Sequence, residues 1–393
     1  MQYERFAVFK HYGRFIQQFI VSALSALPLV VATALVATAL MATTSVALAS
    51  QTVTDVRGRT VEVPDTASRI AIDDGRFLIA LSLIHEDPVS ILAAWAHDAN
   101  RLGADVYADW QEKYPALDEL PRIASSAGAF NVESILAAAP DVMVVSSGAG
   151  PSEAQVQQLE MGGVPVVYID FFTAPFENLE TSLMLLATMT NREDEAESFL
   201  AFRRARLDEI QTRVASLSEE DRPTVFLEPH AGMSSDCCNS PGRGNMGDFI
   251  EFVGGHNIGA DVISQAFGQL NLEYVIASDP DVYIATGGPH LERAGGLVLG
   301  SRYSESEARQ SLVGVSERTG ISFLTSVSKG RVHGFSHQLI NSPLDVVAIE
   351  AFATWIHPEL FADIDVAATL EAINTRYLQV PYRGTYWVDI KPN

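Results

Sequence analysis

Cysteine is nearly absent from this chain, which contains only Cys237 and Cys238 among 393 residues. Two adjacent cysteines cannot form a disulfide framework, and a structural zinc site needs about four ligands. The sequence therefore excludes a fold held together by several disulfides or by a cysteine-based zinc site. Basic residues are also few, with 26 Lys and Arg against 49 Asp and Glu and a formal net charge of −23. Binding to nucleic acid requires a basic surface, and the sequence therefore argues against a nucleic-acid partner.

Motifs of covalent and phosphoryl-transfer catalysis are absent as well. The sequence has no Gly-x-Ser-x-Gly elbow, no Walker loop and no metalloprotease helix, so we expect neither an enzyme nor a cofactor. Residues 242–247 match the Gly-x-Gly-x-x-Gly pattern of dinucleotide-binding proteins. The preceding predicted strand ends near Glu228, too far upstream for that function, so we interpret these glycines as a loop that leads into a helix.

The N-terminus has the pattern of an export signal. Basic residues precede a long apolar stretch, and residues 47–49 (Ala-Leu-Ala) resemble a signal-peptidase site. A membrane anchor is the alternative, because the stretch is long enough to span a bilayer, but Pro28 and the cleavage pattern disfavour it. Since no cysteine lies nearby, we predict a cleaved signal peptide at residues 1–49 and a soluble periplasmic protein without a lipid anchor. N-terminal sequencing of the exported protein should give Ser50, and finding Met1 would contradict this prediction.

After the leader, short apolar runs alternate with helical stretches in two successive sets. The predicted strands are residues 69–73, 88–92, 141–145 and 164–170, then 224–228, 281–285 and 331–335. The predicted helices are residues 77–84, 132–139 and 153–161, then 246–253, 272–278, 344–356 and 366–377. Apolar strands separated by helices indicate parallel sheets covered on both faces. We therefore predict an α/β protein of two lobes, each a mainly parallel sheet with flanking helices.

A charged run without Gly or Pro separates the two sets. Residues 192–217 keep apolar side chains at helical spacing, and as one helix they would extend roughly 35–40 Å. An ordinary surface helix is the alternative. The position between two α/β sets favours a connecting helix at residues 191–219, which joins an N-terminal lobe at 50–190 to a C-terminal lobe at 220–393.

An internal repeat supports two lobes of similar topology. Residues 131–148 align without gaps onto residues 271–288, and both contain Glu-x-x-x-Ala-x-x-Pro-Asp-Val. In each copy, Asn caps a short helix, Pro ends it, and Asp leads into a buried strand. Ligands of open α/β sheets bind beyond the carboxyl ends of the strands. The loops at residues 146–150 and 286–290 should therefore border a ligand cleft between the lobes.

Taken in order, these motifs resemble the iron-siderophore, haem and cobalamin binding proteins of ABC importers, whose lobes are joined by one long helix. Residues 54–64 are similar to the mature N-terminus of that family, residues 247–258 to its second-lobe helix and turn, and residues 357–363 to its C-terminal segment. The resemblance spans nearly the whole mature chain. It implies a monomeric binding protein that captures a metal chelate, most simply a ferric siderophore, and delivers it to an ABC importer permease. Haem or cobalamin remains the alternative within the class, and a bare metal ion or an exported enzyme the alternative outside it.

Candidate ligand-binding residues follow the predicted strands. They are Arg76, Trp95, His97, His230, Cys237, Cys238, Arg243, His290 and His337. Arginine suits an anionic chelate and tryptophan its apolar rim, although core packing is the alternative for Trp95. We predict no direct metal ligand, because only His333 and His337 are close in the sequence. After export to an oxidising compartment, we expect the cysteine pair to be at least partly oxidised to a disulfide.

The resemblance also implies a docking glutamate on each lobe, which meets arginines of the permease. The matching positions are Glu153 in the first lobe and Glu273 in the second. Glu133, the repeat mate of Glu273, is the alternative in the first lobe. Each glutamate would sit in the first turn of a helix, where it could instead do no more than favour the positive end of the helix dipole.

Overall fold

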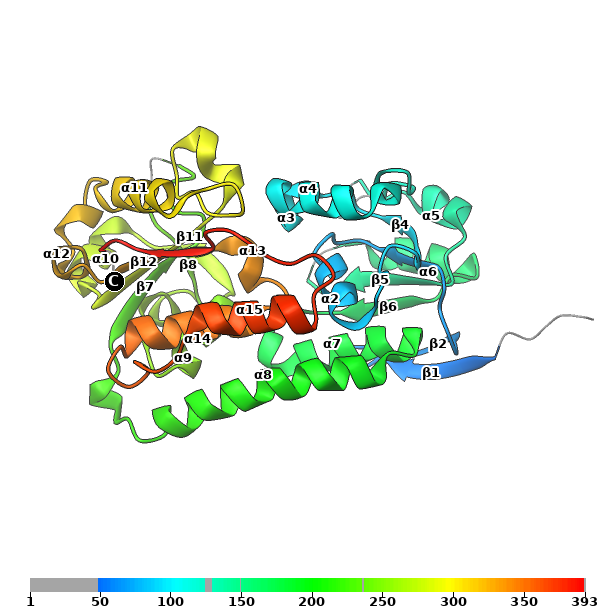
Figure 1. Ribbon diagram of the computed structural model, residues 1–393, viewed down its shortest axis with the longest axis horizontal. Coiled ribbons are helices and arrows are strands. Elements are labelled where there is room, and N and C mark those ends of the chain that lie inside the picture. Colours follow the sequence, from blue (N-terminus) through cyan, green and yellow to red (C-terminus); the bar gives the residue numbers. More distant parts are fainter. Residues whose placement is uncertain (1–48, 124–128, 149, 235–236, 392–393) are drawn as a thin grey trace, which may run out of the picture. The chain divides into compact units, whose positions relative to one another are not determined.

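The computed structural model describes residues 49–123, 129–148, 150–234 and 237–391, so the predicted leader lies outside the described residues except for its last residue. Residues Ser50–Asn393 form one compact unit. Within this unit, two sheets with flanking helices lie side by side along the longest axis, and one long helix runs beneath both (Figure 1). We call the part around the first sheet the first lobe and the part around the second sheet the second lobe.

The first sheet consists of strands that are almost entirely buried. All neighbouring pairs are parallel, and the order is β4 (Leu92–Trp95), β3 (Ile70–Ile72), β5 (Val142–Ser146) and β6 (Val166–Ile169). Burial on both faces explains why these strands read as continuous apolar runs. A separate antiparallel pair, β1 (Ser50–Thr54) and β2 (Thr60–Pro64), forms the segment that resembles the family's mature N-terminus.

The second sheet is parallel except for one edge strand. Its order is β13 (Trp387–Asp389), β12 (Val332–Ser336), β11 (Val282–Gly287), β7 (Thr224–Glu228) and β9 (His256–Asn257), with β13 antiparallel. A short antiparallel pair lies apart from it, formed by β8 (Asn239–Pro241) and β10 (Phe267–Gln269). Two mainly parallel sheets with helices confirm the predicted fold class.

Helices flank both sheets. Those of the first lobe are α2 (Phe77–Ile84), α3 (Ala99–Leu102), α4 (Ala104–Lys113), α5 (Val132–Ala138), α6 (Glu153–Met161) and α7 (Pro175–Thr190). Those of the second lobe are α9 (Met246–Phe252), α10 (Leu272–Ser278), α11 (Glu305–Ser316), α12 (Thr325–Lys329), α13 (His337–Ile340), α14 (Asp345–Ile356) and α15 (Val366–Arg376). Helices α4, α7 and α11 and the short helices α3, α12 and α13 were not predicted from the sequence.

The internal repeat folds as one structural unit in each lobe. The Asn131 side chain caps α5 by accepting from the Ser134 amide at 3.1 Å, and Asn271 caps α10 by accepting from the Glu273 amide at 2.8 Å. Both helices end on a left-handed residue, Ala139 in α5 and a matching aspartate in α10, before Pro-Asp leads into the strand. The predicted helix–proline–strand unit therefore occurs once in each lobe.

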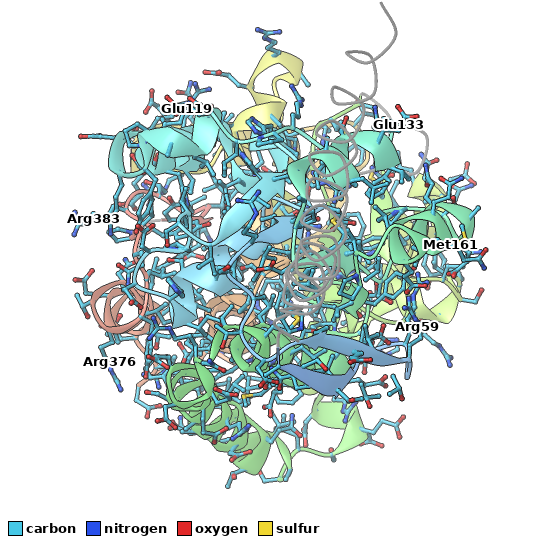
Figure 2. All side chains as sticks on the ribbon, turned by 90° about the vertical axis from the view of Figure 1, so that its right-hand side faces the viewer. Arg59, Glu119, Glu133, Met161, Arg376 and Arg383 are labelled. Carbon is cyan, nitrogen blue, oxygen red and sulfur yellow. A yellow bond between two sulfur atoms is a disulfide. The ribbon has the colours of Figure 1, made fainter. Side chains whose placement is uncertain are left out.

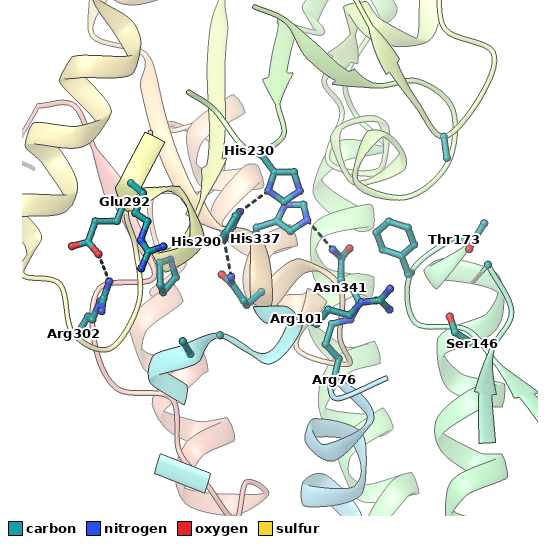
Figure 3. Close-up of a pocket in the computed structure, with 18 residues that line it drawn as sticks. Arg76, Arg101, Ser146, Thr173, His230, His290, Glu292, Arg302, His337 and Asn341 are labelled. Atoms are coloured by element: carbon teal, nitrogen blue, oxygen red, sulfur yellow. Dashed lines mark hydrogen bonds and ion pairs between the residues drawn. The ribbon is translucent and has the colours of Figure 1, made fainter. Parts of the chain in front are cut away.

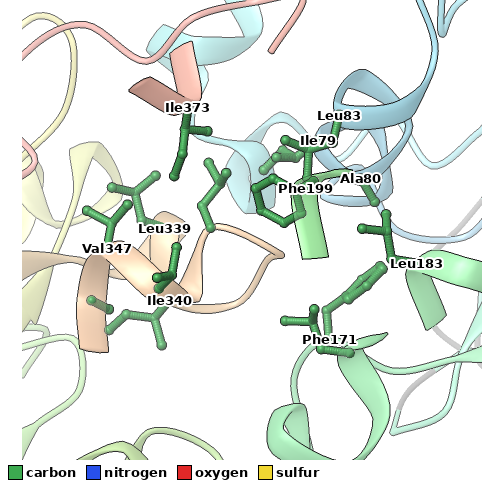
Figure 4. Packing of buried hydrophobic residues seen from close by; sticks show 14 of the residues in the cluster. Ile79, Ala80, Leu83, Phe171, Leu183, Phe199, Leu339, Ile340, Val347 and Ile373 are labelled. Carbon is green, nitrogen blue, oxygen red and sulfur yellow. The ribbon is translucent and has the colours of Figure 1, made fainter. Parts of the chain in front are cut away.

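The long helix α8 spans Glu193–Val214 and connects the two sets of elements. Its 22 residues give a length of about 33 Å. One hydrophobic cluster extends from α2 through α8 into α13, α14 and α15, and Phe199 of α8 lies between Ile79 and Ile373 within it (Figure 4). This continuous core packs α8 against both lobes along its length.

A buried ion pair ties α8 to the second lobe. The Arg203 guanidinium donates to both Asp345 carboxylate oxygens, at 2.9 and 2.7 Å, and the two residues are 2% and 0% exposed. Removing one partner of a buried pair leaves an uncompensated charge, so Asp345→Ala should lower the free energy of unfolding by about 3–5 kcal/mol. Urea denaturation measures this loss. Asp363→Ala, which breaks the exposed ion pair between Asp363 and Arg213 of the same helix α8, is the matched control and should change stability little.

Candidate functional site

A cavity of about 1050 Å³ opens between the carboxyl ends of the strands of the two sheets. Side chains of both lobes line it, and most of them are polar (Figure 3). The lining includes Arg76, Arg101, Ser146, Phe172, Thr173, His230, His290, Glu292, Arg293, Arg302, His337, Gln338 and Asn341. Residues of both predicted loops, 146–150 and 286–290, contribute to this lining, as expected at the carboxyl ends of parallel strands.

Contacts between the lobes bound this cleft on two sides. The Asp105 carboxylate of α4 accepts from the Ser301 backbone amide at 2.6 Å and from the Ser301 hydroxyl at 3.0 Å. Elsewhere, the Phe172 ring of the first lobe stacks on Phe267 of the second, with centroids 5.6 Å apart. These contacts between the lobes hold the two walls of the cleft in position relative to each other.

Two arginines held by one carboxylate form the first-lobe wall. Asp74 accepts from Nε and Nη2 of Arg76 at 3.0 and 2.7 Å, and from Nη1 of Arg101 at 2.5 Å. Asp74 is fully buried, whereas the side chains of Arg76 and Arg101 are 14% and 33% exposed. Burial alone would raise the pKa of Asp74, but the two guanidinium groups lower it well below its usual range. A permanently ionised Asp74 thus fixes both arginines at the cleft surface.

Two further carboxylates lie beneath these arginines. Both Asp73 oxygens accept from the Ser146 backbone amide, and burial together with Asp74 raises the pKa of Asp73 well above its usual value. Asp98 accepts from the Gly75 amide at 2.8 Å, while its second oxygen is buried without a hydrogen-bond partner among the described residues. Burial and the charge of Asp74 raise the pKa of Asp98 to about 7. The charge of this wall therefore changes within the neutral pH range.

Three histidines from separate segments meet on the second-lobe wall: His230 after β7, His290 after β11 and His337 at the start of α13. The ring of His230 lies 5.0 Å from that of His290 and 3.8 Å from that of His337, measured between centroids (Figure 3). Burial lowers the pKa of all three, and His290 adds to the effect on His230, whose pKa falls to about 4. The three imidazoles are therefore neutral at physiological pH.

Hydrogen bonds define which nitrogen of His230 carries the proton. The Ser336 hydroxyl donates to the Gln338 side-chain oxygen at 3.1 Å, so the Gln338 amide donates to Nδ1 of His290 at 3.4 Å. His290 then donates from Nε2 to Nδ1 of His230 at 2.9 Å. This relay leaves the proton of neutral His230 on Nε2, which has no hydrogen-bond partner among the described residues. The second-lobe wall thus presents an N–H donor.

The second-lobe wall also contains two arginines. Arg302 pairs with Glu292 at 2.5 Å and is 49% exposed, and Arg293 is exposed on the same loop. Among the described residues, four arginines and a single carboxylate line the cleft, with two arginines on each wall. This local excess of positive charge contrasts with the chain as a whole, whose net charge is −23. Arginine N–H groups recognise carboxylates and other oxyanions through paired hydrogen bonds. The cleft is therefore suited to an anion.

The histidine cluster does not have the geometry of a bare-metal site. In the ranges that the structure describes, no group of three or more His, Cys, Asp or Glu residues could hold a metal ion. The rings of the cluster instead bond to one another and to neighbouring polar side chains. Any metal bound in the cleft would therefore need most of its ligands from another molecule.

Four of the nine predicted ligand residues line the cleft, namely Arg76, His230, His290 and His337. Trp95 does not, because its ring is 0% exposed in the core and donates to the Leu117 carbonyl at 2.9 Å. His97 stacks on Trp95 with ring centroids 4.4 Å apart and is also absent from the lining.

Three other predicted ligand residues lie outside the cleft. Arg243 is exposed on the loop before α9, and the cysteine pair lies elsewhere in the second lobe. Cys237 and Cys238 are disulfide-bonded, as predicted.

Sequence reasoning missed Arg101, Arg293 and Arg302. A usable signal existed for the first two, since each follows a strand of its sheet within about ten residues. Arg101 lies beyond β4 and Arg293 beyond β11. The prediction named no residue beyond His97 after β4 and none beyond His290 after β11, whereas the segments that follow the strands contribute side chains over a longer stretch.

The three candidate docking glutamates all occupy first helical turns and are exposed. Glu153 begins α6 and pairs with Arg57 at 2.8 Å, with 71% of its side chain exposed. Glu133 of α5 lies at the periphery of the first lobe (Figure 2). Neither Glu133 nor Glu273 of α10 has an ion pair among the described residues.

Several known proteins are similar to this chain in fold or in sequence. The chain is similar to a crystal structure of the TroA-like periplasmic binding protein FepB from Veillonella parvula, with a TM-score of 0.78 and 24% identity over 86% of this chain and 99% of that one. It is 24% identical to the molybdate-binding protein MolA of Haemophilus influenzae over 259 residues, 61% of this chain and 69% of that protein. It is 26% identical to the vitamin B12-binding protein of Salmonella typhimurium over 201 residues, 51% of this chain and 70% of that protein.

The next two findings concern membrane-spanning helices and the family of the chain. Within the described residues, no helix combines the length and the apolar character needed to cross a membrane. A family model described as "Periplasmic binding protein" matches residues 81–314, more than half of the sequence. The resemblance found in the sequence is thereby confirmed, and the chain belongs to the periplasmic binding protein family.

Proposed function

We propose that this protein is the periplasmic substrate-binding component of an ABC importer, and that its ligand is an anionic metal chelate of the ferric siderophore class. The observation that carries the proposal is that four arginines and the His230 N–H donor line the same cleft, with arginines on both of its walls. Oxygen-rich chelates carry negative charge at their rim, which guanidinium groups match. The bound chelate is handed to a membrane permease, the partner implied by the family.

Cavity size favours a chelate over a small oxyanion. The cleft measures about 1050 Å³, slightly above the range of roughly 300–1,000 Å³ for sites that enclose drug-sized ligands. A tetrahedral oxyanion such as molybdate would fill only a small part of this volume.

A thermal-shift panel tests the proposal. The purified protein is mixed with a ferric carboxylate chelate, a ferric catecholate, a ferric hydroxamate, haem, cobalamin, molybdate and nickel–histidine. A ligand at 100 times its Kd stabilises the native state by about 2.7 kcal/mol, which raises the melting temperature measurably. We expect the anionic ferric chelates to give the largest shifts. A shift with molybdate alone, or with none of the chelates, would contradict the proposal.

Haem or cobalamin is the second candidate, and His230 is the observation in its favour. A neutral imidazole beside the cavity is a common axial ligand of iron or cobalt. Direct ligation through Nε2 requires the proton to leave that atom, which reverses the relay from Gln338 through His290. A Soret band that appears with added haem in the wild type and is lost in His230→Ala would favour this candidate.

Catalysis is not part of the proposal. An exported enzyme that uses the same cleft would convert its ligand, whereas a binding protein shows saturable affinity without turnover. Recovery of each stabilising ligand unchanged after prolonged incubation distinguishes the two.

Binding of an anionic chelate should weaken as the pH rises through about 7. Below this value Asp98 is neutral, and above it an added negative charge lies 3.6 Å from Arg101, where it competes with the ligand. Titration calorimetry across the neutral range, with a chelate that does not itself titrate there, measures the effect. Asp98→Asn should flatten the profile at the tighter, low-pH affinity. An unchanged slope in this variant would contradict the assignment to Asp98.

A further inference from the structure

The vicinal cysteine pair lies outside the ligand cleft, yet it borders a cavity of its own. This second-lobe cavity has a volume of about 580 Å³, and its lining includes Cys237, Asn271, Leu272 and Arg318. The disulfide between Cys237 and Cys238 therefore lies beside space that a small molecule can enter. Nothing in the proposed transport function uses this site.

The two sulfur-bearing residues differ in accessibility. Cys238 is 0% exposed and packs in the second-lobe core with Phe226 and Leu270. Cys237 is only partly buried and lines the cavity. A reagent that enters the cavity therefore meets Cys237, whereas Cys238 is fully buried.

A cation adjoins the same cavity. The Arg318 guanidinium donates to Glu228 at 2.9 Å and to the Tyr283 hydroxyl at 3.1 Å, and these buried partners fix it in place. Its side chain is 18% exposed. The ion pair with Glu228 offsets much of its charge, so Arg318 contributes a partly exposed guanidinium edge to the cavity and no free cation. The thiolate is the form of a thiol that attacks a disulfide.

The cysteine backbone is also bonded to the segment that precedes α10. The Cys238 carbonyl accepts from the Leu270 amide at 2.8 Å, and the Cys237 carbonyl accepts from the Gln269 side chain at 3.4 Å. The next residue, Asn271, is the N-cap of α10. The chain conformation at the cysteine pair thus helps to set the start of this helix.

We propose that the Cys237–Cys238 disulfide is a thiol-exchange site, at which a small external thiol attacks Cys237 and thereby loosens the start of α10. The thiolate sulfur forms a new bond to Sγ of Cys237 while the Cys237–Cys238 bond breaks. The electron pair remains on Sγ of Cys238, which takes a proton from water. A second external thiolate then attacks the sulfur of the bound thiol, which leaves as an external disulfide while the bond to Sγ of Cys237 breaks and Cys237 takes a proton from water. Two external thiols are thereby oxidised while the protein disulfide is reduced to two thiols.

Trapping of the mixed disulfide tests the site of attack. The native protein is treated briefly with glutathione, denatured in excess maleimide, and sequenced by fragment-ion mass spectrometry. We expect glutathione on Cys237 and maleimide on Cys238. Glutathione on Cys238, or exchange that occurs only after unfolding in urea, would overturn the proposal.

Single variants provide an independent measurement. In Cys238→Ser the remaining Cys237 thiol should form a mixed disulfide with oxidised glutathione in the native state. In Cys237→Ser the Cys238 thiol should stay unmodified until urea is added. Similar reactivity of the two thiols in native protein would contradict the asymmetry. The trapping experiment on the wild type stands even if a variant fails to fold.

Hydrogen exchange tests the link to α10. Reduction of the wild type with dithiothreitol should lower amide protection in residues 269–275, while α15 serves as the matched control and stays unchanged. Equal protection in both redox states, or loss that extends to α15, would overturn the link. If Glu273 docks to the permease, reduction should also impair transport, a consequence that rests on the proposed function. The trapping and exchange experiments need no permease, so their failure is distinguishable from failure of that function.

Discussion

Neutralising the two arginines of the first-lobe wall should nearly abolish binding of an anionic chelate. Arg76→Gln and Arg101→Gln each remove a charged donor that Asp74 holds at the cleft surface. Hydrogen bonds to charged groups contribute roughly 1.5–3 kcal/mol each, so each variant should bind about tenfold to a hundredfold more weakly. The double variant should lose more than either one. Isothermal titration with the chelate that gives the largest thermal shift measures these losses.

Two controls separate ligand binding from folding. Arg204→Gln removes an arginine of α8 whose partners are Glu180 and Glu197, away from the cleft lining, and should leave affinity unchanged. Melting temperatures of all variants report whether Asp74, deprived of one partner, destabilises the fold. A double variant with lower stability but normal affinity for every anionic chelate would show that the arginines serve Asp74 and not the ligand.

Much of the fold could be predicted because its signals are local. Strands β5, β7 and β11 are continuous apolar runs, and the structure places them within about two residues of the predicted ranges. The repeat succeeded for the same reason, since the Asn cap and the Pro-Asp stop act within a single helix. Helix α7 was missed although it has 16 residues, because its N-terminal half is polar and its buried face shows only against the sheet.

The candidate site was less predictable because its residues meet only after folding. His230 and His290 are 60 positions apart in the chain, and no local pattern indicates that their rings share a hydrogen bond. Their loops converge because β7 and β11 are neighbouring parallel strands. That pairing was not deduced from the sequence. The prediction for Trp95 was wrong for a different reason. Its position at the end of a strand was interpreted as part of the cleft, whereas its indole ring is buried in the core.

Removing the docking glutamates should stop transport while leaving ligand binding intact. Glu153→Ala combined with Glu273→Ala changes two exposed first-turn residues, and surface substitutions of this kind alter stability little. Charge pairs across an interface govern recognition and register, so uptake through the cognate permease should fall at least about tenfold. Uptake of labelled chelate into proteoliposomes that contain the permease measures the loss, with affinity determined in parallel. Glu160→Ala, at the opposite end of α6, is the matched control.

Single variants decide which first-lobe glutamate takes part. Glu153 already pairs with Arg57 at 2.8 Å, so a permease arginine must displace or share that partner, at a cost in Coulomb attraction. Glu133 has no such competitor among the described residues, and it occupies the same position in its repeat as Glu273 does. If Glu153→Ala transports normally and Glu133→Ala does not, the symmetric pair Glu133 and Glu273 forms the docking surface. Normal uptake by the Glu153 and Glu273 double variant and by all single variants, or loss of ligand affinity in their place, would contradict docking through these helices altogether.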